Sequence, residues 1–197
     1  MNALLLSGGL DSALLLHHVL ENVKASDLLA ISVDYGQAHG EQELGAAREV
    51  AHWAGVRHAV LQFSNTLAVP EPGGVVPGRN LAFVASSASW LDSAGGGDLF
   101  MGICSEDEAG FPDCRAGFVE SCNDLLSICE LRVRLVAPWL RLSKGEILQK
   151  MLGNPGAMQA AARSYSCYLG AANPCGECAA CVKRARALGS VSMPACL

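Results

Sequence analysis

The chain has 197 residues, of which 51% are hydrophobic and 17% are charged, so it can bury a substantial core in one domain or one domain with a small appendage. Its 14 basic and 19 acidic residues give a net charge of −5, which argues against a broad nucleic-acid surface but allows a local anion pocket. No basic N-terminal segment precedes a long apolar run, and no stretch reaches the ~18 apolar residues of a membrane helix, so we expect a soluble cytoplasmic protein.

Short apolar runs alternate along the chain with longer segments of helical periodicity. The short runs predict strands at 3–6, 28–33, 58–63, 98–103 and 131–136. The periodic segments predict helices at 12–22, 40–54, 80–93, 115–127 and 143–152. Between the third strand and the third helix, residues 65–78 are rich in proline and glycine and predict a loop. The alternation predicts an α/β fold, with a parallel sheet covered by helices on both faces.

Two regions differ in composition. Residues 1–163 carry the alternating pattern, and a sheet of this kind binds ligands at the carboxyl ends of its strands, where the strand order reverses. Residues 164–197 contain cysteine, glycine and proline with little regular periodicity. We therefore expect one ligand-binding domain and a short tail packed on it.

The segment SGGLDS, which begins at Ser7, stands between the first predicted strand and the first predicted helix. Gly8 and Gly9 let an anion approach backbone N–H groups, and the helix N-terminus adds donors and the positive end of the helix dipole. Ser7 and Ser12 can donate hydroxyl hydrogen bonds to phosphate, whereas Asp11 suits Mg²⁺ or the orientation of a backbone turn. The alternative is a tight turn with Ser12 as a helix cap. The segment resembles the PP-loop of enzymes that cleave ATP between its α and β phosphates, a group with a doubly wound parallel sheet.

Nine cysteines, an odd number, argue against a disulfide framework. Four of them fall within 15 residues: Cys167, Cys175, Cys178 and Cys181. Their two C-x-x-C steps suit one tetrahedral zinc ion that folds the tail, although thiolates alone leave a [4Fe–4S] cluster open. The other thiols are predicted to lie in the core or on the surface: Cys104, Cys114, Cys122, Cys129 and Cys196.

Further motifs follow in order along the chain: DYGQ from Asp34, VPGRN from Val76, GICSEDEAGFPDCRAGF from Gly102 and SCYLGAANPCGECAAC from Ser166. Together with SGGLDS, they are similar to the motifs of 7-cyano-7-deazaguanine synthases, the QueC family of queuosine precursor biosynthesis. The resemblance extends over most of the chain.

This resemblance implies an ATP-dependent carbon–nitrogen ligase. ATP would activate the carboxylate of 7-carboxy-7-deazaguanine, ammonia would capture it as an amide, and a second ATP would drive dehydration to the nitrile. A carboxylate resists nucleophiles until one oxygen belongs to a phosphate-type leaving group, which is why ATP is required. The family also implies magnesium as a cofactor and a homodimer as the assembly.

The matching motifs assign ATP and magnesium to Ser7, Gly8, Gly9, Leu10, Asp11, Ser12, Asp34, Tyr35 and Gln37. They assign the deazaguanine to Arg79, Asn80, Glu106, Asp107, Phe111 and Asp113, with a carboxylate accepting from the base and the phenyl ring stacking on it. Asp11, Lys144 and Arg79 are the expected catalytic residues, the two cations meeting phosphate or carboxylate charge. The alternatives are a solvated lysine, a surface arginine and an acidic solvated loop. His17 and His18, adjacent on a helix, are interpreted as structural.

The chain departs from the family pattern between the third strand and PGRN, where it has only residues 64–76, and it ends soon after the cysteine cluster. This shortening does not affect the residues assigned to ATP, and it leaves the identity of the acceptor undetermined. A second hypothesis is therefore a QueC-like paralogue, such as those of antiphage defence operons, that joins a deazaguanine carboxylate to an amine on a protein. A sulfur-transfer enzyme acting on tRNA would need a catalytic cysteine pair and a basic RNA-binding region, and the net charge does not favour it. A non-enzymatic zinc module would leave SGGLDS unexplained.

Overall fold

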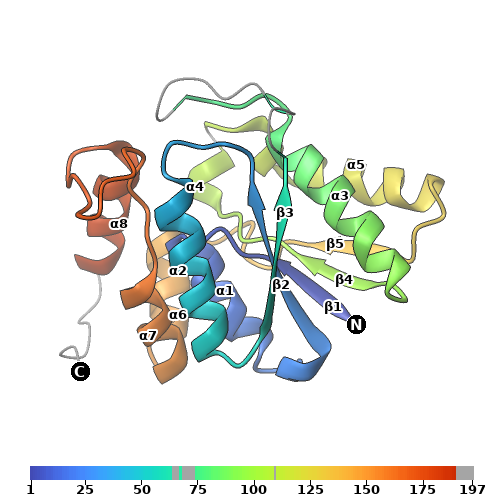
Figure 1. The fold of residues 1–197 in the computed structure, drawn as a ribbon, viewed down its shortest axis with the longest axis horizontal. Helices are drawn as coiled ribbons and strands as arrows, with labels where there is room; N and C mark the ends of the chain where they lie inside the picture. The colour runs from blue at the N-terminus through green and yellow to red at the C-terminus, as the bar shows by residue number, and fades with distance from the viewer. Residues whose placement is uncertain (64–66, 68–73, 109, 190–197) are drawn as a thin grey trace.

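The computed structural model describes residues 1–63, 67, 74–108 and 110–189, and in them one parallel sheet has the strand order β3-β2-β1-β4-β5 (Figure 1). The strands are β1 (Asn2–Leu5), β2 (Leu28–Asp34), β3 (Arg57–Gln62), β4 (Gly97–Phe100) and β5 (Val133–Val136). The expected doubly wound α/β fold is confirmed. The strand order reverses between β1 and β4, which places the ligand edge there.

Helices cover both faces of the sheet (Figure 1). One face carries α1 (Leu10–Val19), α2 (Gly40–Trp53), α6 (Lys144–Met151) and α7 (Pro155–Arg163). The other face carries α3 (Arg79–Ser93) and α5 (Ala116–Ile128). The remaining elements are the short helices η1 (Ala25–Asp27), α4 (Ser105–Glu108) and η2 (Pro112–Cys114), and α8 (Ala179–Gly189), which packs beside α6. Among the described residues, no helix combines the length and the apolarity that crossing a membrane requires.

The core consists of two layers, because alternate strand residues point to opposite faces of the sheet. Leu4 and Ala30 pack toward α1, α2, α6 and α7, whereas their neighbours Ala3 and Ile31 pack toward α3 and α5. All four are fully buried, and a buried large aliphatic side chain contributes about 1.5–3 kcal/mol to folding. The central strands β1 and β2 are accordingly mostly apolar on both of their faces, as a sheet covered on both faces requires.

The strand predicted at 98–103 ends earlier, at Phe100. Beyond that point the chain passes the start of α1, where a Cβ atom added to Gly102 would lie 3.3 Å from backbone atoms of Asp11 and Ser12. The missing side chain lets the helix start approach the sheet at the reversal of strand order. Helix α1 itself begins at Leu10, two residues before the prediction, so the end of the SGGLDS segment belongs to the helix.

The helices α4, α7 and α8 were not predicted from the sequence. The start of α7 has a recognisable signal, because the Asn154 side chain accepts a hydrogen bond from the N–H of Ala157 and Pro155 occupies the first turn. Helix α8 lies in the tail that the composition described as irregular, and its Ala187 joins the main core. The loop predicted at 65–78 lies largely outside the described residues.

Candidate active site and cysteine cluster

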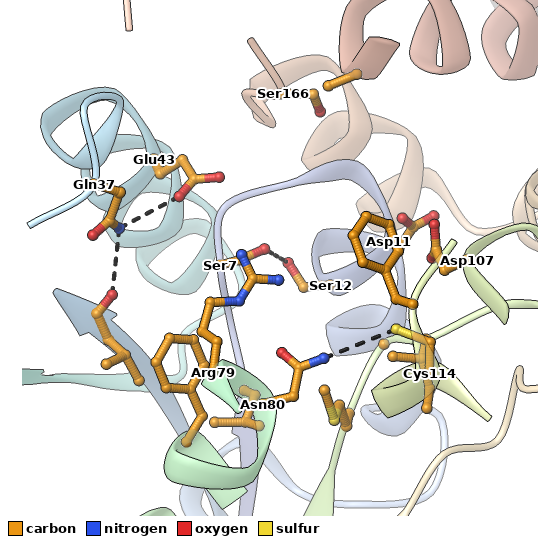
Figure 2. Close-up of a pocket in the computed structure, with 18 of the residues that line it drawn as sticks. Ser7, Asp11, Ser12, Gln37, Glu43, Arg79, Asn80, Asp107, Cys114 and Ser166 are labelled. Carbon is orange, nitrogen blue, oxygen red and sulfur yellow. Dashed lines mark hydrogen bonds between the residues drawn. The ribbon is translucent and has the colours of Figure 1, made fainter. Parts of the chain in front are cut away.

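A cavity of about 340 Å³ lies at the carboxyl ends of β1 and β2 and beside the segment that follows β4 (Figure 2). Its walls come from the starts of α1, α2, α3 and α6, from the η2 region, and from the tail. The volume lies within the range of small-molecule sites. The cavity therefore occupies the position where a doubly wound sheet binds its ligand.

Most of the predicted site residues line this cavity: Ser7, Leu10, Asp11, Ser12, Tyr35, Gln37, Arg79, Asn80, Asp107, Phe111, Asp113 and Lys144. Four predicted residues are absent from its lining: Gly8, Gly9, Asp34 and Glu106. The Asp34 carboxylate instead accepts from the N–H of Gly36 at 3.2 Å, and Glu106 accepts from the N–H of Lys144 at 2.9 Å. These two acids hold the backbone around the cavity.

The SGGLDS loop leaves the start of α1 without a side-chain cap. The Ser12 hydroxyl donates to the carbonyl oxygen of Gly9 at 3.0 Å and lies 3.1 Å from the Ser7 hydroxyl, so Ser12 does not act as the helix cap. The start of α1 lines the cavity, and its first N–H groups are therefore available to bind an anion there. Gly8 has a packing function as well: with φ at +85°, its missing Cβ makes room for the carbonyl oxygen of Glu43 on α2.

A row of alternating charges forms one wall of the cavity. The Lys144 ammonium lies 2.5 Å from Asp11 Oδ2 and 3.5 Å from Asp107 Oδ2, and Lys183 Nζ lies 3.6 Å from Asp107 Oδ1. Burial by itself lowers the pKa of Lys144, but the Asp11 and Asp107 carboxylates raise it above its ordinary value. The other oxygen of Asp11, Oδ1, is buried without a hydrogen-bond partner among the described residues. This oxygen can bind a cation.

Arg79, at the start of α3, is held on an aromatic surface. Its Nη1 donates to the Tyr35 hydroxyl at 3.3 Å, and its guanidinium lies 5.8 Å from the Tyr35 ring centre and 5.9 Å from that of Phe83. The group is half-buried and lines the cavity, which separates it from an ordinary surface arginine. A guanidinium held in this way can bind a phosphate or carboxylate through two parallel hydrogen bonds.

Sequence reasoning missed a half-buried pair at the start of α2, formed by His39, which precedes the helix, and Glu43 in its first turn. The Glu43 carboxylate lies 3.5 Å from His39 Nε2 and accepts from Gln37 Nε2 at 3.5 Å, and both His39 and Glu43 line the cavity. Desolvation raises the pKa of Glu43 to about 7. A spacing of four residues on the helix after DYGQ could have indicated that the two share a face. The cavity residues of the tail had no such signal: Ser166, Tyr168, Ala180, Lys183 and Arg184.

Two cysteines predicted as core or surface thiols lie at the site. Cys114 lines the cavity and accepts from the Asn80 amide at 3.9 Å, while Cys104 donates to Asp107 at 3.2 Å. Burial raises the pKa of each thiol to about 12, so both are protonated. The remaining thiols are Cys122, which is buried in the core, Cys129, which is exposed, and Cys196, which lies outside the described residues.

The four clustered cysteines come together beside the cavity. The sulfur atoms of Cys167, Cys175, Cys178 and Cys181 all lie within 4.8 Å of one another, so they can hold a metal ion. The N–H of Cys175 donates to the Cys167 sulfur at 3.4 Å, and this bond is the largest of several that together lower the pKa of Cys167 to about 6, which favours its thiolate.

The cysteine segment also braces the cavity. The N–H of Tyr165 donates to the carbonyl oxygen of Gly8 at 2.8 Å, and the ring of Tyr168 lies 5.9 Å from that of His39. Arg184 on α8 donates to the carbonyl oxygen of Ala161 at 2.7 Å. A metal bound by the four cysteines would therefore fix one wall of the cavity.

Comparison with known proteins identifies the family of the chain. Residues 2–192 match the family described as "Queuosine biosynthesis protein QueC". The chain is 36% identical over 210 positions to the 7-cyano-7-deazaguanine synthase of Laribacter hongkongensis (strain HLHK9), covering 96% of this chain and 90% of that protein. It is 35% identical over 210 positions to the protein of the same name from Chromobacterium violaceum, covering 96% and 89%. Because 210 aligned positions exceed the 197 residues of this chain, the Laribacter protein is longer within the aligned region.

A solved structure shares the fold. The chain resembles the U34-tRNA thiolase NcsA from Methanococcus maripaludis with its [4Fe-4S] cluster, with a TM-score of 0.56 and 15% identity. The match covers 94% of this chain and 63% of that chain, so this chain spans less than two thirds of the thiolase. At this identity the likeness shows the fold alone.

Proposed function

Because this chain belongs to the QueC family of queuosine biosynthesis proteins, we propose that it is an ATP-dependent ligase that converts 7-carboxy-7-deazaguanine and ammonia to an amide and then to 7-cyano-7-deazaguanine. The observation that carries the proposal is the Lys144–Asp11 pair at the uncapped start of α1. The relatives compared above are named 7-cyano-7-deazaguanine synthase. A lysine, a carboxylate and free helix N–H groups are the groups that an ATP-cleaving site needs.

In the first step, a carboxylate oxygen of the substrate attacks the α-phosphorus of ATP, and pyrophosphate leaves. The start of α1, with the hydroxyls of Ser7 and Ser12, binds the departing pyrophosphate. The Lys144 ammonium moves from Asp11 to the phosphate oxygens and stabilises the negative charge that develops on them. Asp11 Oδ1 and Asp107 are the groups that would hold Mg²⁺, which neutralises phosphate charge when bound.

The acyl adenylate then reacts with ammonia, which gives the amide and releases AMP. In the nitrile step, the amide oxygen attacks the α-phosphorus of a second ATP and displaces pyrophosphate. The amide nitrogen then loses its two protons while the C–O bond breaks with its electron pair on AMP, which gives the nitrile. Arg79 is suited to hold the carboxylate or the α-phosphate, because its fork is fixed against Tyr35. The deazaguanine would lie between Phe111 and the polar groups of Asn80 and Asp113, all of which line the cavity.

We assign zinc to the four-cysteine cluster. A tetrahedral ion with sulfur ligands at about 2.3 Å separates those sulfurs by about 3.8 Å, close to the separations here, which are all within 4.8 Å. A [4Fe–4S] cluster binds each cysteine through a different iron, which spreads the sulfurs further apart. The zinc would stabilise the tail and, through it, a wall of the cavity.

The test is a reaction of the purified protein with MgATP, ammonium and 7-carboxy-7-deazaguanine, with the products identified by mass spectrometry. We expect the amide to appear first and then the nitrile, with AMP and pyrophosphate released. Asp11→Asn should abolish pyrophosphate release, whereas Asp124→Asn, a change at an exposed position on α5, should leave it unchanged. Equal rates for the two variants would contradict the assignment of the phosphate loop.

The acceptor has a second candidate, an amine on a protein. The observation that favours it is the segment before α3: Val75 and Val76 line the cavity, Val75 is 62% exposed, and the aligned relatives are longer than this chain. An exposed wall at this point would admit a larger nucleophile. Under this alternative, the reaction with ammonium would stop at the amide or give no product, and a covalent deazaguanine adduct on a protein would be found instead. Sulfur transfer is not proposed, since burial keeps the pKa of Cys104 and Cys114 near 12.

A further inference from the structure

The mechanism above does not use Glu43, which nevertheless faces the reaction cavity. Its side chain is 19% exposed and lines the cavity, and its backbone carbonyl packs against Gly8 of the phosphate loop. Figure 2 shows Glu43 on the α2 side of the cavity, with Ser7 and Ser12 between it and the acidic pair of Asp11 and Asp107. The carboxyl group is thus beside the loop assigned to ATP and apart from the Lys144 wall.

The neighbours of Glu43 orient it without neutralising it fully. Gln37 Nε2 and His39 Nε2 each lie 3.5 Å from its Oε2, and the Gln37 amide oxygen is fixed by the N–H of Tyr35 at 3.0 Å. The charged group that faces it from α3 is Arg79, which is already bound to the Tyr35 hydroxyl. Burial dominates over these contacts and raises the pKa of Glu43 to about 7.

The Asp11–Asp107 pair and the two buried thiols near the cavity are less suited to accept a proton. Asp11 and Asp107 are engaged by Lys144, and Lys183 adds a second cation beside Asp107. Burial raises the pKa of the Cys104 and Cys114 thiols to about 12, so they hold their protons at neutral pH. Among the described carboxyl groups lining the cavity, Glu43 and Asp113 have no ion pair to a lysine or arginine, and of these two Glu43 lies beside the phosphate loop.

We propose that Glu43 is the proton acceptor for the amine nitrogen that attacks the activated carboxylate, with Gln37 and His39 as the residues that position it. This inference rests on the proposed ligase function. Ammonium gives a proton to the Glu43 carboxylate and enters as ammonia, whose nitrogen lone pair forms the C–N bond. The acyl–phosphate C–O bond breaks with its electron pair on AMP. Glu43, having passed its first proton to solvent, accepts the second proton that the new amide nitrogen must lose.

The expected size of the effect follows from the chemistry. A positioned general base contributes about 10²- to 10⁴-fold to a rate, and its optimum pKa lies near the working pH. Hydroxylamine provides the contrast, because it is largely unprotonated at neutral pH and is a strong nucleophile that needs little help from a base. A variant without the base should therefore lose reaction with ammonium and retain reaction with hydroxylamine.

The experiment compares Glu43→Gln with Glu41→Gln, a change at an exposed position of the same helix. Each variant, with its full chain and bound metal, is given MgATP, the deazaguanine carboxylate and either ammonium or hydroxylamine. For Glu43→Gln we expect amide formation to fall about 100-fold or more while hydroxamate formation stays within about threefold of the unmodified protein. Glu41→Gln should leave both rates unchanged. If Glu43→Gln does not fold, Glu43→Asp should show the same contrast in reduced form.

A second readout is the pH profile of amide formation at a fixed concentration of free ammonia. The unmodified protein should gain rate as the pH rises to about 7 and then reach a plateau, and Glu43→Gln should lack this rise. Equal losses with ammonium and hydroxylamine would overturn the inference and assign Glu43 to structure or ATP binding, as would an unchanged amide rate. If the unmodified protein forms no hydroxamate at all, the ligase function fails and this inference fails with it.

Discussion

Replacing Glu43 with glutamine is expected to stabilise the protein at pH 8 even if it removes activity. In the folded chain, burial raises the pKa of Glu43 from 4.5 to about 7, whereas the unfolded chain restores the lower value. Between these two pH values, the folded state holds a proton that the unfolded state has released. The free energy of unfolding contributed by this group therefore falls as the pH rises from about 4.5 to about 7, and stays low above that.

The size of this effect can be bounded from the same shift in pKa. The difference between 4.5 and about 7, at about 1.4 kcal/mol for each pH unit, corresponds to about 3 kcal/mol. The side chain is 19% exposed, and its surroundings can relax on ionisation, so the measured value should be about 1–3 kcal/mol. Glutamine has nearly the same shape and no charge, so it can keep the contact with Gln37 and avoid the cost of ionisation.

The assay is urea unfolding of the unmodified protein, Glu43→Gln and Glu41→Gln at pH 5, 6, 7 and 8, all with metal bound. The difference in unfolding free energy between Glu43→Gln and the unmodified protein should rise by about 1–3 kcal/mol from pH 5 to pH 8. Glu41→Gln should show no such trend, because its carboxyl group is exposed. A difference that is constant with pH, or that falls, would refute the argument that Glu43 is held ionised at a cost.

Three further outcomes are expected. Lys144→Gln should lower pyrophosphate release by about 100-fold or more, because it removes the ammonium from between two carboxylates, and a loss below threefold would contradict its role. Gly8→Ala should lower the free energy of unfolding by about 1–3 kcal/mol, since φ is +85° and the new Cβ meets a carbonyl oxygen of α2. The control Gly45→Ala, where a Cβ meets nothing within 4 Å, should stabilise α2 by about 0.5–1 kcal/mol in the same unfolding measurement. Cys178→Ser should lose the metal in elemental analysis and weaken ATP binding, whereas Cys129→Ser, at an exposed thiol outside the cluster, should keep both.

The amino-acid sequence alone determined those features that are contiguous along the chain. The alternation of short apolar and longer periodic segments predicts the doubly wound sheet, because strands that are apolar on both faces must be covered by helices on both faces. SGGLDS is local to one strand–helix turn, and the four cysteines are local to one short segment of the tail, so both could be identified before any contact was known. The QueC family, expected from the order of its motifs, is confirmed by the match over residues 2–192.

The tertiary structure decided where the side chains of these motifs lie. Asp34 and Glu106 belong to matching motifs, yet their carboxylates bind backbone N–H groups and are absent from the cavity lining. Glu43 and Lys183 were not among the predicted site residues. They line the cavity because α2 packs on the phosphate loop and α8 packs beside α6. The physical reason is distance along the chain: Lys144 lies 133 positions from Asp11, and only the reversal of strand order beside α1 brings the two within 2.5 Å.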